Sequence, residues 1–146
     1  AVVATDLVDW GCDKSQSGID FLMERKAPDG VPAVVTNPPF KLAPEFAAHA
    51  IDLVPEVYLL MRGAFLEGMR WYSKNENKKG LGLGEHLRRV WMFAPRLPFM
   101  HRHGFEGKKN SNSGMAFAWF VFGRNAAKAG PATIRWINPR DYEDVA

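Results

Sequence analysis

Ala33-Val34-Val35-Thr36-Asn37-Pro38-Pro39-Phe40 is the stretch that decides the fold. Its β-branched first half predicts a buried strand, and two successive prolines end that strand because they lack the N–H that a sheet ladder needs. From Ala43 to Val54 apolar residues recur at helical spacing, with Pro44 tolerated in the first turn and Pro55 ending the helix. The stretch therefore predicts a strand, a turn and a helix in succession.

Strand-like and helix-like segments alternate along the rest of the chain. Buried strands are predicted at Val2 to Leu7, Val57 to Met61, Val90 to Phe93, Met115 to Phe122 and, antiparallel at the end of the sheet, Thr133 to Ile137. A helical turn is predicted within Phe21 to Lys26, and helices are predicted at Ala64 to Tyr72 and Glu85 to Arg89. The tryptophans are predicted to be core or sheet-packing residues: Trp71, Trp91, Trp119 and Trp136. This alternation is typical of the α/β class, in which a mostly parallel twisted sheet is flanked by helices.

Composition limits the class of protein. The 146 residues are 47% hydrophobic and 12% aromatic, which suits a single globular domain spanning 1–146. No apolar run is long enough to cross a bilayer, and a secretory leader pattern is lacking, so we expect a cytoplasmic protein without a membrane partner. The single cysteine, Cys12, fits a reducing compartment. The net charge of +3 is compatible with nucleic acid but does not establish it.

The tetrapeptide Asn37-Pro38-Pro39-Phe40 carries the chemistry. An adenine N6 amine is a poor nucleophile, because its lone pair is delocalised into the ring. The Asn37 amide oxygen and the Pro38 carbonyl are two acceptors that can draw the amine hydrogens out of conjugation. The prolines, Pro39 included, hold the backbone rigidly, and the Phe40 ring can stack on a base swung out of a helix.

In these residues the sequence resembles the amino-methyltransferase family, whose signature is Asp, Asn or Ser followed by two prolines and an aromatic. The resemblance implies a Rossmann-like methyltransferase fold, with the chain as a partial catalytic domain and S-adenosylmethionine as cofactor. It implies that Asp6 holds the cofactor ribose, that Asp20 binds its adenine, and that Phe21 packs on the ring. As alternatives, Asp6 caps a strand-end loop and Asp20 caps a short helix.

One departure from the family concerns its glycine-rich cofactor loop, which would precede Asp6. We therefore expect the sheet to be incomplete at its N-terminal side, with further N-terminal sequence or a partner chain supplying a strand. The segment from Gly80 to Gly84 follows polar residues rather than a buried strand, so it is interpreted as a loop near the substrate.

The resemblance implies transfer of a methyl group from S-adenosylmethionine to adenine N6 in DNA. RNA base amines and protein glutamine remain alternative substrates, and a non-catalytic nucleic-acid-binding protein is the alternative from another class. Phosphate contacts are predicted in or near two polar loops, at Lys78, Lys79, Lys108 and Lys109 and at the neighbouring Arg88, Arg89 and Arg102. No metal site is expected, because His101 and His103 lack a nearby third ligand.

Overall fold

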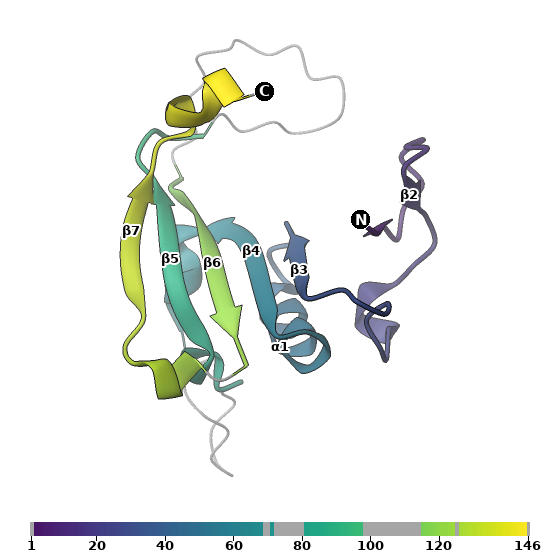
Figure 1. Ribbon diagram of the computed structural model, residues 1–146, viewed down its shortest axis with the longest axis horizontal. Coiled ribbons are helices and arrows are strands. Elements are labelled where there is room, and N and C mark those ends of the chain that lie inside the picture. Colours follow the sequence, from purple (N-terminus) through teal and green to yellow (C-terminus); the bar gives the residue numbers. More distant parts are fainter. Residues whose placement is uncertain (1, 69–70, 72–80, 98–114, 125, 146) are drawn as a thin grey trace.

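Five strands form one mixed sheet in the computed structural model, which describes residues 2–68, 71, 81–97, 115–124 and 126–145. They are β3 (Ala33–Thr36), β4 (Glu56–Arg62), β5 (Leu87–Phe93), β6 (Phe117–Gly123) and β7 (Thr133–Ile137). Their order across the sheet is β3-β4-β6-β5-β7 (Figure 1). β3 runs parallel to β4 and β5 runs parallel to β7, whereas β6 is antiparallel to both of its neighbours.

β6 lies at the centre of the sheet because its side chains are apolar on both faces. Phe120 and Phe122 are fully buried, and Phe117 and Val121, which point to the opposite side, are also buried. A strand apolar on both faces is stable only where neighbours cover its edges and faces. The predicted strand Met115 to Phe122 is thus confirmed with slightly shifted bounds.

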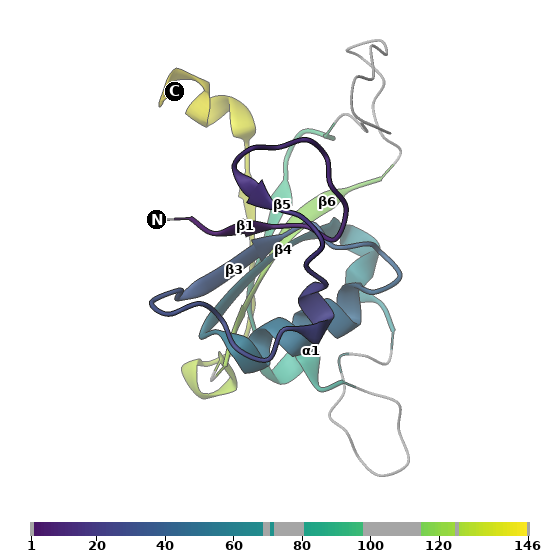
Figure 2. The same ribbon diagram turned by 90° about the vertical axis from the view of Figure 1, so that its right-hand side faces the viewer.

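The helix α1 (Ala43–Leu53) covers one face of the sheet, as Figure 2 shows. Its buried residues are mostly alanines, which allow close packing on the buried side chains of β4: Val57, Leu59 and Met61. Pro44 lies in the first turn, and Val54 ends the helix by donating its backbone N–H to the Ala50 carbonyl. The predictions for this helix and for the preceding strand β3 are confirmed.

The predicted helix-flanked, mostly parallel Rossmann-like sheet is wrong. Among the described residues α1 is the single α-helix, and the antiparallel β6 is inserted between β4 and β5. β7 does lie at the edge of the sheet, but it runs parallel to β5 instead of antiparallel. The sheet is therefore mixed, and its second face carries no α-helix in the described part of the chain.

The helical turn predicted within Phe21 to Lys26 is present as η1 (Phe21–Met23). Two segments predicted to be helices form short 3₁₀ turns in their described parts: η2 (Gly63–Leu66) and η4 (Leu83–Glu85); residues 69–70 and 72 lie outside the described residues. Gly68, with φ +102°, interrupts the helix predicted from Ala64 to Tyr72, because such backbone does not belong to a right-handed helix. Residues from Leu87 onward, partly predicted as helix, extend β5 instead. Two further turns are η5 (Ala126–Ala129) and η6 (Pro139–Val145).

The N-terminal segment forms a separate two-stranded parallel sheet, β1 (Ala4–Thr5) with β2 (Ser15–Gln16). The prediction of a buried strand from Val2 to Leu7 is wrong, because Val2 is 94% exposed and Leu7 is 61% exposed. This segment joins the rest of the molecule through η1, which contacts α1.

A charged network crosses the sheet on the face opposite α1. Arg88 lies at a register irregularity of β5 and donates to the Glu56 carboxylate at 2.9 Å, and the Tyr58 hydroxyl donates to the other oxygen of Glu56 at 2.9 Å. Gly123 of β6 lies beneath Arg88, and a Cβ there would come within 2.8 Å of Arg88 Nε. The missing side chain at Gly123 therefore lets Arg88 reach β4 across β6.

The hydrogen bond to Glu56 raises the pKa of Tyr58 above its usual value of 10.0, and burial of the hydroxyl adds to the effect. We expect Glu56→Gln to lower the pKa of Tyr58 toward 10.0 in an ultraviolet absorbance titration, with Tyr58→Phe identifying the signal. The exposed Glu67→Gln change should leave it unaltered. The pKa of Tyr58 is higher in the folded than in the unfolded chain, so its neutral hydroxyl stabilises the folded state. This contribution to the free energy of unfolding is fully present below the unfolded-state pKa and is lost as pH rises through the folded-state pKa. An unchanged Tyr58 titration in Glu56→Gln would contradict this network.

Candidate functional site

The predicted catalytic tetrapeptide follows directly after β3. The parallel ladder ends where Thr36 pairs with Leu59, and Asn37 then leaves the sheet with its side chain exposed. Pro38 is buried and Pro39 is exposed. The Pro39 carbonyl accepts a hydrogen bond from Leu42 N at 2.9 Å, which fixes the turn into α1. The turn thus presents the Asn37 amide from a backbone held at both ends, by β3 and by α1.

The Phe40 ring is held from one side by residues of β4 and β6. The guanidinium carbon of Arg62 lies 3.9 Å from the ring centroid, which is close enough for a cation–π interaction. The Phe117 ring is tilted against Phe40 with centroids 6.3 Å apart. Arg62 and Phe117 are register partners, so the last residue of β4 and the first of β6 form one support. Phe40 remains 36% exposed, which leaves part of its ring for a flat ligand.

Arg62 was missed by the sequence analysis, although it is the charged residue that closes the apolar strand Val57 to Met61. Its Nε atom is buried and lacks a hydrogen-bond partner in the described part of the chain. A buried donor left unpaired costs about 1–3 kcal/mol, so the contact with Phe40 must offset part of that cost. Arg62 therefore places positive charge against the Phe40 ring, in addition to the exposed Lys41 that follows the tetrapeptide in sequence.

The predicted cofactor residues lie on the N-terminal segment. The backbone N–H of Ile19 donates to the Asp6 carbonyl at 3.1 Å, which brings the loops of Asp6 and Asp20 together. Asp6 Oδ1 accepts from Val8 N at 2.8 Å, and Asp20 Oδ1 accepts from Leu22 N at 3.1 Å. Both acids thus fill the capping roles that were the alternative interpretation. Both side chains are exposed, so their outer oxygens suit the hydroxyl and amine donors of a nucleoside.

Phe21 ties this segment to α1. Its ring stacks on Phe46 with centroids 5.1 Å apart and meets His49 edge-on at 5.2 Å. No hydrogen bond or ring contact within the described residues joins Asp6 or Asp20 to the tetrapeptide. The structure therefore brings the two acids together and holds Asn37 and Phe40 on a separate element.

The remaining predicted residues have different outcomes. Lys78, Lys79, Lys108 and Lys109 lie outside the described residues, as do His101 and His103. In the described ranges, no group of three or more His, Cys, Asp or Glu side chains is arranged to hold a metal ion. Nor does any described helix have the length and apolar character needed to cross a membrane.

No protein-family model matches the chain, and a search of curated proteins also gave no match.

Proposed function

We propose that this chain transfers a methyl group from S-adenosylmethionine to the N6 amine of adenine in DNA. The observation that carries the proposal is the local geometry of the tetrapeptide: an exposed Asn37 on a fixed turn, beside a Phe40 ring backed by Arg62. The proposal rests on this geometry rather than on the fold class, which differs from the one that the resemblance implied.

Each residue of the tetrapeptide has a defined task in the proposed reaction. The Asn37 side-chain oxygen and the Pro38 carbonyl accept the two N6 hydrogens, which localises the nitrogen lone pair. Phe40 stacks on the base and keeps its N6 amine in line with the methyl group that is to be transferred. When bound, S-adenosylmethionine supplies a methyl group on a positive sulfur. As the nitrogen–carbon bond forms and the carbon–sulfur bond breaks, the Asn37 and Pro38 oxygens stabilise the positive charge on N6 until a proton leaves to water.

DNA as partner and the cytoplasm as compartment belong to the same proposal. The single cysteine, Cys12, is exposed, and a low cysteine content is compatible with a reducing compartment. The guanidinium of Arg62 beside the tetrapeptide favours an anionic substrate over a neutral glutamine side chain.

Cofactor binding gives a direct test at Asp6. We expect S-adenosylmethionine to bind the chain in a calorimetric titration, and Asp6→Ala to weaken the affinity about tenfold or more, because a charged acceptor of the ribose hydroxyls is lost. Asp9→Ala is the matched control: Asp9 is exposed in the same loop and accepts from Gly11 N at 2.9 Å in the same manner. Equal affinities for both variants, or no binding to the unaltered chain, would overturn the assignment of Asp6.

A further inference from the structure

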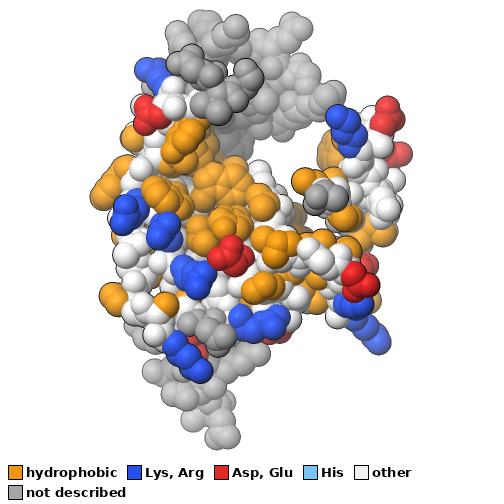
Figure 3. Space-filling view, in the orientation of Figure 1, with side chains coloured by type: hydrophobic (Ala, Val, Ile, Leu, Met, Phe, Trp, Pro, Cys, Tyr) orange, Lys and Arg blue, Asp and Glu red, His pale blue; other side chains and the backbone are white. Residues whose placement is uncertain are grey.

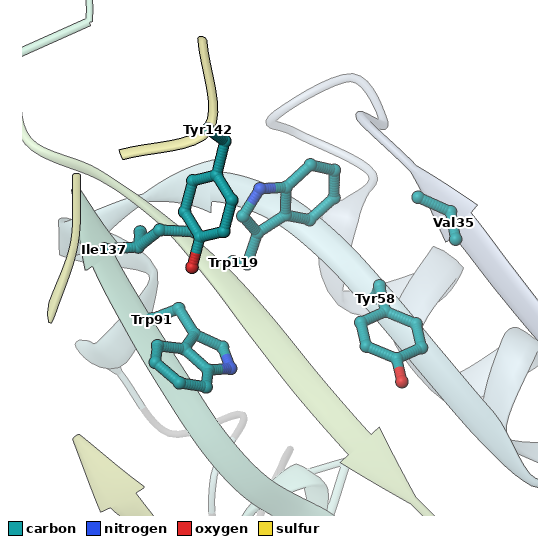
Figure 4. Close-up of a pocket in the computed structure, with 6 residues that line it drawn as sticks. All are labelled: Val35, Tyr58, Trp91, Trp119, Ile137 and Tyr142. Carbon is teal, nitrogen blue, oxygen red and sulfur yellow. The ribbon is translucent and has the colours of Figure 1, made fainter. Parts of the chain in front are cut away.

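The face of the sheet opposite α1 carries an aromatic hollow. It is lined by one residue from each of the five strands and one from η6: Val35, Tyr58, Trp91, Trp119, Ile137 and Tyr142 (Figure 4). We call this surface the aromatic face. The hollow has a volume of about 300 Å³ and opens to solvent. Aromatic side chains gathered in an open hollow offer a contact surface for a flat ligand.

Trp91 and Trp119 were expected to be sheet-packing residues, and they do pair across β5 and β6. Both are only partly buried, however, and in Figure 4 both indole rings project from the sheet on the side of Tyr142. Trp71, in contrast, packs in the core against Phe65 and Phe122, as expected. The two indoles of the aromatic face therefore have the geometry of a stacking platform.

Positive charge borders the aromatic face on its β5 and β7 side. The guanidinium carbon of Arg89 lies 5.2 Å from the Trp91 ring centroid, and the exposed Arg135 is the register partner of Trp91. Among the described strand residues of this face the acid is Glu56, whose charge is paired with Arg88. Figure 3 shows Lys and Arg side chains beside the hydrophobic area. In η6 the acid Asp141 lies beside Tyr142 and accepts a hydrogen bond from Asn138 Nδ2 at 3.0 Å. Arg89 and Arg135 therefore make the β5 and β7 side of the rim, and not the η6 side, complementary to a polyanion.

The aromatic face is continuous with the tetrapeptide. Arg62 and Phe117 pair on the same side of the sheet as Trp119, since residues two apart in a strand share a face at a spacing of about 7 Å. Phe40 packs on Arg62 and Phe117. A ligand that covers Trp119 can therefore extend to Phe40 along one surface.

We propose that the aromatic face binds an unpaired nucleic-acid strand, with bases stacked on Trp91 and Trp119 and phosphates beside Arg89 and Arg135. Flat rings in a hollow can stack only on bases that are out of their pairs, whereas a duplex presents phosphates and groove edges. This inference rests on the proposed function where it connects the aromatic face with the tetrapeptide. It adds that the substrate is a strand that is unpaired around the target adenine.

The test measures binding of a labelled thymidine-only oligonucleotide of about 12 nucleotides to the full chain by fluorescence anisotropy. We expect tighter binding of this strand than of a duplex of equal length, and an affinity about tenfold lower in Trp91→Ala. Trp136→Ala is the matched control, because Trp136 is 69% exposed and lies on the opposite face of β7 from Arg135. The affinity of Trp136→Ala for the oligonucleotide should equal that of the unaltered chain.

The exposed Arg135 provides a variant that leaves the core intact. Arg135→Gln should reduce the slope of log affinity against log salt concentration by about 0.7, the value for one phosphate contact on a single strand. Asn37→Ala should bind the thymidine strand with unchanged affinity, because Asn37 does not line the aromatic face. If the unaltered chain binds the strand but transfers no methyl group, the proposed reaction is wrong and the aromatic face is retained.

Two results would overturn the assignment. The first is that the unaltered chain does not bind the oligonucleotide, or that it binds with the same affinity as both Trp91→Ala and Arg135→Gln. The other is a dimer, seen by sedimentation of the unaltered chain, that Trp91→Ala dissociates without changing oligonucleotide affinity; the aromatic face would then be covered by a second copy.

Discussion

Asn37→Ala is expected to lower the rate of methyl transfer to adenine-containing DNA by about 100-fold or more. The alanine removes the side-chain acceptor that localises the N6 lone pair, and loss of one such positioned group typically costs that much in rate. Asn37 is exposed at the end of β3, so the substitution should leave the fold intact. Initial rates with a radiolabelled methyl donor measure the effect.

Lys41→Ala is the control for Asn37→Ala. Lys41 is exposed in the same turn, immediately after Phe40, and has no part in the proposed reaction. We expect its transfer rate to stay within about twofold of the unaltered chain, as for most surface substitutions. Equal rates for Asn37→Ala and the unaltered chain would remove Asn37 from the catalytic site.

Phe120→Ala should be the most destabilising single change in the sheet. Phe120 is fully buried on the central strand β6, and its ring meets Phe65 edge-on with centroids 5.1 Å apart. Truncation of a buried phenylalanine leaves a cavity and costs about 3–5 kcal/mol, a large part of the free energy of unfolding of a small domain. Urea denaturation should show the loss as a lower midpoint at an unchanged slope.

Trp136→Ala serves here as the reference for an aromatic residue that does not support the core. Its side chain is 69% exposed on the edge strand β7, so we expect a loss of less than about 1 kcal/mol. Similar midpoints for Phe120→Ala and Trp136→Ala would show that β6 is not the central strand of the folded chain.

Local patterns predicted the elements that depend on neighbouring residues. β3 ends at the prolines, and α1 lies between Ala43 and Leu53 within the predicted bounds. The strand runs that became β4 and β6 were also predicted, because their apolar residues are continuous, and β7 was predicted from its β-branched and aromatic residues. Such patterns report burial and period, and both are set by residues close together in sequence.

Strand direction and order could not be predicted in this way. The antiparallel entry of β6 between β4 and β5 depends on pairings between residues far apart in sequence, such as Leu60 with Trp119. No local sequence signal distinguishes an antiparallel central strand such as β6 from a parallel strand that is buried on both faces. The α/β expectation also relied on helices that the chain does not form: Gly68 interrupts the one predicted from Ala64 to Tyr72, and pairing of Leu87 onward in β5 replaces the one predicted from Glu85 to Arg89.

The site was predicted in part. The tetrapeptide was identified from its residue types, but its support by Arg62 and Phe117 arises only when the ends of β4 and β6 meet. The aromatic face was missed for a related reason, because tryptophans within apolar strands are normally core residues. Trp91 and Trp119 are only partly buried, since the described part of the chain has no α-helix on that side of the sheet.

The most direct test of the central claim is the identity of the methylated product. The chain is incubated with adenine-containing DNA, part of it unpaired, and a methyl donor carrying deuterium, and the nucleosides are then separated and analysed by mass spectrometry. The account predicts deuterated N6-methyldeoxyadenosine with the unaltered chain and almost none with Asn37→Ala. Absence of this nucleoside with the unaltered chain, or label on another atom of DNA, would contradict it.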